Sequence, residues 1–157
     1  MFDKLEKRIV MKYEIETKSD LHIGVGATTA PGEIDLPVIK NSEGVPIIPG
    51  STLKGVLRSE IERLLKSKFG DEKISDSDGT QLEKFKAHSS ELFGGKMLAS
   101  DKKIKDFASS IRIRDATANT SRTRIRDGVR IDSEKRKAVP GGLYQIEVVP
   151  KGVIFSG

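Results

Sequence analysis

The chain of 157 residues contains no cysteine and no tryptophan, and only two tyrosines and six phenylalanines. The missing cysteines exclude disulfide bonds and thiolate metal sites. No apolar run approaches the roughly 20 residues that a membrane span requires, and the first residues carry no apolar stretch typical of a signal peptide. We therefore expect a cytoplasmic protein with no part in a membrane.

Positive charge is concentrated in one segment rather than spread along the chain. The net charge is +5, and residues 111–140 hold nine basic and four acidic residues, an excess equal to that of the whole chain. Most of the nine are arginine, whose planar guanidinium suits bidentate phosphate contacts and stacking on bases. The segment indicates an anionic partner such as RNA, although an ordinary solvated face is the alternative interpretation.

Alternating apolar residues predict strands over residues 11–18, 110–116 and 143–149, with a further extended segment from residue 153. Residues 36–39 and 45–48 are short extended pieces around a turn and predict a small hairpin. A helix is expected to begin at Ser51 as N-cap and to end at Gly70, with a buried apolar stripe at helical spacing. That stripe comprises Leu53, Val56, Leu57, Ile61, Leu64 and Leu65.

Two segments between these elements are polar. Residues 71–90 have few large apolar residues and are predicted to form a long flexible loop. Residues 117–140 are predicted to project as a basic β-hairpin, which we call the thumb, with a turn at Asp127-Gly128. Arg122, Arg124 and Arg126 alternate and should share one face of this hairpin, and Arg130 follows the turn. The element order predicts an α+β chain that begins like a ferredoxin-like (RRM-like) fold, in one domain over residues 1–157.

The start of the predicted helix is one candidate site. Pro49-Gly50-Ser51 places a glycine beside free main-chain N–H groups, and Lys54 and Arg58 add positive charge nearby. A helix N-terminus of this kind binds phosphate groups. Plain helix capping explains the same residues, and the sequence leaves both interpretations open.

The loop after the first strand is the second candidate site, because it carries His22, Glu33 and Asp35. A loop carboxylate is able to hold Mg²⁺ or to position an RNA 2′-hydroxyl for attack on its own phosphate. A turn role for Asp35 before Leu36-Pro37 is equally consistent with the sequence. For His22, a hydrogen-bonded structural histidine is favoured over a general base.

Five segments, in this order along the chain, resemble one family. They are residues 21–24 (LHIG), 35–40 (DLPVIK), 48–55 (IPGSTLKG), 92–94 (LFG) and 126–132 (RDGVRID). Together they resemble the RAMP superfamily of CRISPR-associated proteins, and most of all the backbone subunit of type III effector complexes. Compared with that family, the sequence stops before the second helix, the final strand and a glycine-rich loop, so we expect a truncated RAMP fold.

The resemblance implies a function. Such subunits stack as copies in a filament along a CRISPR guide RNA beside other effector subunits, and each thumb kinks the guide–target duplex. It implies that Asp35 is catalytic and binds Mg²⁺ or another divalent metal, so that target RNA is cut in antiviral defence. It also implies RNA contacts by His22, Ser51, Lys54 and Arg58, and by Arg122, Arg124, Arg126 and Arg130 of the thumb.

Four interpretations remain at this level. The chain is either the metal-dependent endoribonuclease described above, a purely structural RNA-binding subunit, or a CRISPR RNA-processing ribonuclease. The last would use metal-independent acid–base chemistry at His22. A basic protein-interaction module is the fourth possibility, and a steep loss of RNA affinity with salt would argue against it.

Overall fold

The computed structural model describes residues 7–27, 33–134 and 136–157. Contacts divide the chain into two compact units, one formed mainly by residues 49–114 and the other by residues 11–48 and 115–157. We refer to them as the helical unit and the sheet unit. None of the described helices combines the length and the apolar character that crossing a membrane requires.

The sheet unit is built on a four-stranded antiparallel sheet in the order β1-β10-β7-β2. Its strands are β1 (Glu14–Glu16), β2 (Ile47–Ile48), β7 (Ala116–Ala118) and β10 (Ile154–Ser156). Phe155 is the most buried large side chain of its core, with 1% of its surface exposed, and Ala116 of β7 is fully buried. The residues that contribute most to this core are therefore small and β-branched, apart from one phenylalanine.

The first strand is shorter than residues 11–18, and the predicted alternation is confirmed from Tyr13 to Thr17 but not at Met11, which is 75% exposed. Tyr13, Ile15 and Thr17 are half-buried or buried, whereas the charged residues between them are exposed. Main-chain hydrogen bonds from Tyr13 to Gly157 and from Thr17 to Val153 extend the pairing at both ends of β1. The predicted strand at 110–116 is wrong except at its last residue, since β7 begins at Ala116.

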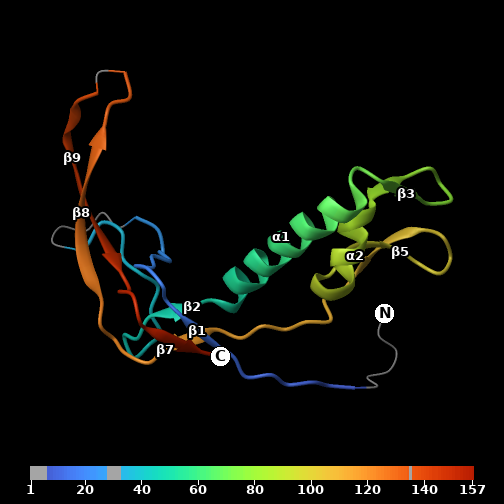
Figure 1. The fold of residues 1–157 in the computed structure, drawn as a ribbon, viewed down its shortest axis with the longest axis horizontal. Helices are drawn as coiled ribbons and strands as arrows, with labels where there is room; N and C mark the ends of the chain where they lie inside the picture. The colour runs from blue at the N-terminus through green and yellow to red at the C-terminus, as the bar shows by residue number, and fades with distance from the viewer. Residues whose placement is uncertain (1–6, 28–32, 135) are drawn as a thin grey trace. The chain divides into compact units, whose positions relative to one another are not determined.

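A long hairpin of β8 (Arg124–Ile131) and β9 (Ala138–Val148) extends from the sheet unit (Figure 1). The predicted turn at Asp127-Gly128 is wrong, because these residues pair with Gln145 and Tyr144 inside the ladder. The chain reverses instead after Ile131, where Asp132 N–H bonds to the Lys137 carbonyl. A basic hairpin is nevertheless confirmed, but it spans residues 124–148 rather than 117–140, and the name thumb refers to this hairpin from here on.

The helical unit contains α1 (Gly50–Phe69), β3 (Lys73–Ser75), β4 (Gln81–Glu83), α2 (Lys84–Phe93), β5 (Gly95–Leu98) and β6 (Ile104–Phe107). Its core is centred on Phe85 and Phe93 of α2. The prediction of a loop over residues 71–90 is wrong, since this segment forms a short hairpin and most of α2. The hairpin pairs β3 with β4, and β5 pairs with β6 in a second short hairpin that lies after this segment.

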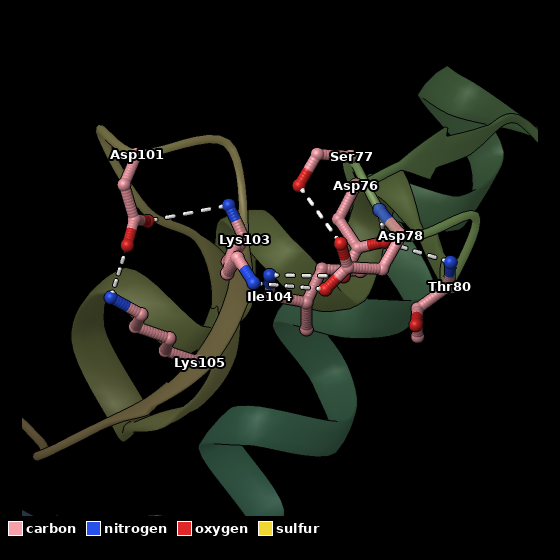
Figure 2. Close-up of polar contacts among 8 residues, drawn as sticks. All are labelled: Asp76, Ser77, Asp78, Thr80, Asp101, Lys103, Ile104 and Lys105. Atoms are coloured by element: carbon pink, nitrogen blue, oxygen red, sulfur yellow. Dashed lines mark hydrogen bonds and ion pairs between the residues drawn. The ribbon is translucent and has the colours of Figure 1, made fainter.

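Figure 2 shows how these hairpins are joined at their tips. The Asp76 carboxylate accepts hydrogen bonds from the N–H groups of Asp78 (3.0 Å), Thr80 (2.8 Å) and Ile104 (3.3 Å). The Lys103 ammonium lies 3.1 Å from Asp78. Although burial raises the pKa of Asp76, the hydrogen bonds outweigh it and hold the pKa below its ordinary value. The polar side chains of residues 71–90 thus stabilise an ordered turn.

Helix α1 ends at Gly70 as predicted, but its start and its buried face differ from the prediction. It begins at Gly50 with Pro49 as N-cap and no side-chain cap, so the N-cap role of Ser51 is wrong. A Cβ on Gly50 would lie 2.2 Å from the carbonyl oxygen of Ile113, which explains the glycine there. Within the predicted stripe, Val56 and Leu64 are 63% and 54% exposed, so this stripe is buried only in part.

Candidate nucleic-acid interface

Asp35 is fixed against the outer edge of β9. Leu36 forms main-chain hydrogen bonds of 2.9 Å with both Gln145 and Glu147, so the loop runs beside β9 like a short parallel strand. The Asp35 carboxylate then accepts a hydrogen bond of 2.6 Å from the Gln145 N–H. The loop carboxylate therefore has a defined position on the same strand that forms one half of the thumb.

Glu147 ties this loop to the base of the thumb. Its side chain is only 3% exposed, and it accepts hydrogen bonds from the Val38 N–H (3.0 Å), the Lys40 ammonium (2.6 Å) and the Thr123 hydroxyl (2.6 Å). Burial by itself raises the pKa of Glu147, but the hydrogen bonds from Lys40, Thr123 and Val38 outweigh it and lower the pKa below its ordinary value. Glu147 is thus ionised, and its carboxylate accepts hydrogen bonds from three different residues.

His22 lies beside the same strand. Its Nδ1 is 2.7 Å from the carbonyl oxygen of Glu147, and a Cβ on Gly24 would lie 2.7 Å from its Nε2. A carbonyl oxygen can only accept a hydrogen bond, so Nδ1 is the donor of this contact. The structure therefore brings His22 and Asp35 to positions two residues apart along β9, and it gives His22 a structural bond.

The thumb arginines are all exposed, but they do not form one continuous row. Arg124 and Arg126 share a face of β8, whereas Arg122 precedes the strand and Arg130 lies at an irregularity in the pairing between Val129 and Ile131. Arg126 is 3.4 Å from the Asp20 carboxylate, in an ion pair whose arginine side chain remains 64% exposed. Such a pair contributes little stability and leaves the guanidinium accessible.

The other predicted RNA contacts belong to the helical unit. Ser51 is exposed and Lys54 half-buried in the first turns of α1. Arg58 donates hydrogen bonds to Glu62 (2.8 Å) and to the Gly94 carbonyl (3.2 Å), so its guanidinium joins α1 to the end of α2. RNA contact by these three residues stays a prediction, and for Arg58 the structure adds an internal role.

Reasoning from the sequence missed Glu147, Gln145 and Thr123. One signal for Glu147 was present, because a lone carboxylate between Ile146 and Val148 in a strand indicates a specific partner. The partners Val38 and Lys40 are more than 100 residues away in sequence, and nothing local identifies them.

Among the described residues, no group of three histidine or acidic side chains is arranged to hold a metal ion. Asp35 offers a single carboxylate, of which Oδ2 accepts the Gln145 N–H. Mg²⁺ is often held by one or two carboxylates together with substrate phosphates and water. Metal binding by Asp35 therefore stays a prediction, since its single carboxylate would need further oxygen ligands from a substrate or from water.

The chain has an α+β fold with an antiparallel sheet and a protruding basic hairpin. A family model described as the RAMP superfamily matches residues 14–156, and the chain therefore belongs to the RAMP superfamily. A chain in the cryo-EM structure of the Type III-B Cmr-beta bound to cognate target RNA has a similar fold. Its TM-score is 0.50 at 15% identity, over 92% of this chain and 81% of that one.

Curated relatives match part of the chain. The CRISPR system Cms endoribonuclease Csm3 of Streptococcus thermophilus is 40% identical over 73 residues, which are 45% of this chain and 33% of the relative. The protein of the same name from Enterococcus italicus is 46% identical over 61 residues, 38% of this chain and 27% of the relative. The matched segments thus span a third or less of these relatives.

Proposed function

We propose that this chain is an RNA-binding backbone subunit of a type III CRISPR effector complex that cuts guide-paired target RNA at Asp35 in antiviral defence. One observation carries the proposal. A loop carboxylate is held in place by the main chain of the same strand that forms the exposed basic thumb. Membership of the RAMP superfamily and the partial likeness to the Csm3 endoribonucleases support it.

In this proposal the thumb binds RNA and positions it for Asp35. Arg124 and Arg126 on one face, with Arg122 and Arg130 beyond them, contact phosphates of the guide–target duplex. Ser51, Lys54 and Arg58 contribute contacts from α1, and His22 supports the Asp35 loop beside the RNA. The partners are the CRISPR guide RNA, the target RNA, further copies of the chain in a filament and other effector subunits, in the cytoplasm.

Cleavage is attack of a target 2′-hydroxyl on the adjacent phosphorus. The bond from that oxygen to phosphorus forms as the bond from phosphorus to the 5′-oxygen breaks. The 2′-hydroxyl gives up its proton to water and the 5′-oxygen takes up a proton from water, which leaves a 2′,3′-cyclic phosphate and a 5′-hydroxyl. A divalent cation such as Mg²⁺, when bound, supplies positive charge where the phosphate gains negative charge. Asp35 provides an oxygen ligand for that cation, and the Gln145 N–H keeps the carboxylate in place.

The experiment compares Asp35→Asn with the unchanged chain in an assembled complex on guide-paired target RNA. Cleavage should fall by at least about 100-fold while RNA affinity stays within about twofold, because the amide keeps the acceptor oxygen but loses the charge. Asp71→Asn is the matched control, since Asp71 is an exposed carboxylate of the helical unit. Normal cutting by Asp35→Asn would show that Asp35 is not the catalyst.

A second candidate is a structural RNA-binding subunit without cleavage activity. The observation in its favour is the hydrogen bond from the Gln145 N–H to Asp35, which gives this carboxylate a structural role. Intact RNA binding with no cleavage in Mg²⁺ or Mn²⁺ supports this candidate. Cleavage that survives EDTA and is lost in His22→Ala indicates instead a metal-independent processing ribonuclease.

A further inference from the structure

The Tyr144 ring lies across the thumb in the space left by a glycine. Tyr144 of β9 is directly opposite Gly128 of β8. A Cβ placed on Gly128 would be 2.3 Å from Cζ of the Tyr144 ring and 2.6 Å from its hydroxyl oxygen. The ring therefore covers the main chain of β8, and no side chain at position 128 stands between it and the strand.

The surroundings of the ring are open and basic. Residues directly opposite, and residues two apart on one strand, share a face, so Tyr144 shares its face with Arg126. Gly142 is the next residue of β9 on that face, and a Cβ there would lie 3.1 Å from Cβ of Arg130. The ring thus has arginines on either side along β8 and glycines at positions 128 and 142.

This environment differs from that of the core aromatic residues. Phe85, Phe93 and Phe155 are at most 6% exposed, whereas Tyr144 is only half-buried on a hairpin whose arginines are exposed. A tyrosine that covers a cross-strand glycine also stabilises a hairpin, and that role accounts for one side of the ring. It does not account for a partly exposed aromatic surface between two cations.

The geometry points to Tyr144 as a stacking platform for an RNA base, and this inference rests on the proposed function. Every base has an aromatic face, so an aromatic side chain next to phosphate-binding cations recognises single-stranded or unstacked nucleotides with little regard to sequence. Arg126 and Arg130 bind the phosphates that flank the stacked base. Because the ring already lies against β8, stacking requires little further ordering of the side chain.

The first test measures the affinity of the full chain for two RNA probes of equal length, an oligouridine and the same strand with abasic ribose positions. The unchanged chain and Tyr144→Phe should prefer the base-bearing strand by about 5-fold to 100-fold. Tyr144→Leu should lose this preference yet keep the affinity for the abasic strand. Leu143→Ala, on the opposite face of the same strand, is the matched control and should behave like the unchanged chain.

Two further measurements do not depend on how Tyr144→Leu folds. Gly128→Ala places a methyl group where the ring now lies, so it should displace the ring and reduce the preference for bases with Tyr144 still present. Photo-crosslinking of 4-thiouridine RNA to the unchanged chain should attach RNA to the tryptic peptide 138–151, which holds no other aromatic residue.

The outcomes separate this inference from the proposed function. If neither RNA is bound by the unchanged chain, both fail. If RNA is bound with a steep salt dependence but the chain has no preference for bases, or if Tyr144→Leu retains that preference, only the role of Tyr144 is overturned. Crosslinks confined to other peptides, or loss of the preference in Leu143→Ala alone, would also overturn it.

Discussion

The ammonium of Lys40 lies 2.6 Å from the buried carboxylate of Glu147, across more than 100 residues of sequence. Lys40 extends from the segment that follows Asp35, and Glu147 is near the base of β9. This pair, with the Thr123 hydroxyl and the Val38 N–H, holds the Asp35 loop to the thumb. The Glu147 carboxylate therefore supports the candidate catalytic loop together with the main-chain pairing of Leu36 and the hydrogen bond from Gln145 to Asp35.

Substitution of Glu147 should destabilise the protein. Glu147→Gln removes the charge and leaves at least one buried donor poorly paired, which should lower the free energy of unfolding by about 1–3 kcal/mol. Urea denaturation followed by circular dichroism measures this difference. Glu43→Gln, at an exposed turn residue, is the control, and a Glu147→Gln change as small as that of the control would contradict the role of Glu147.

The same carboxylate makes stability depend on pH. The pKa of Glu147 in the folded protein lies below its ordinary value of 4.5, so the unfolded chain takes up the proton first as pH falls. The stabilisation is complete above the unfolded pKa and is lost as pH falls through the folded pKa. The stability gap between the unchanged chain and Glu147→Gln should therefore narrow below about pH 4.5. A gap that is constant from neutral pH to acid would be inconsistent with the lowered pKa.

Asp76 should matter for the two hairpins of the helical unit. Asp76→Ala deprives three main-chain N–H groups of their acceptor and should lower the Tm by a few degrees, because the turn and its link to Ile104 are lost together. Asp76→Asn keeps an acceptor oxygen and should be intermediate. Thermal unfolding followed by circular dichroism tests the order of the three proteins, with the exposed Asp71→Ala as control.

Salt should weaken RNA binding in proportion to the phosphates contacted. Replacing Arg124 and Arg130 by alanine should reduce the slope of log affinity against log salt by about one per arginine, whatever the RNA sequence. Measurements between low and moderate salt on one oligouridine are sufficient. An unchanged slope in the double variant would exclude phosphate contacts by these two arginines.

The local patterns in the sequence were reliable guides to single elements. Alternation over residues 143–149 predicted β9, and the glycine at position 70 marked the end of α1. They failed where a distant partner decided the structure. Asp127-Gly128 has turn chemistry, yet Tyr144 covers the glycine and Gln145 bonds to the aspartate at 3.3 Å, so both residues stay in the ladder.

The candidate site was predictable in its residue types but not in its assembly. The sequence favoured a loop carboxylate, and the family resemblance singled out Asp35. That Asp35 and His22 both lie along β9 follows from main-chain pairing over more than 100 residues, which no spacing rule reveals. Polar residues 71–90 illustrate the opposite error, since side-chain acceptors such as Asp76 stabilised turns that composition alone assigned to a loop.

The two faces of β9 have different roles: Tyr144 lies on the face of the arginines, and Glu147 lies on the opposite face, where it holds the Asp35 loop. Successive residues of a strand point to opposite faces, so inserting or deleting one residue between them reverses every side chain beyond that point. Glu147 would then turn away from Lys40 onto the face of the arginines. Between Tyr144 and Glu147, the protein should therefore tolerate substitutions better than the insertion or deletion of one residue.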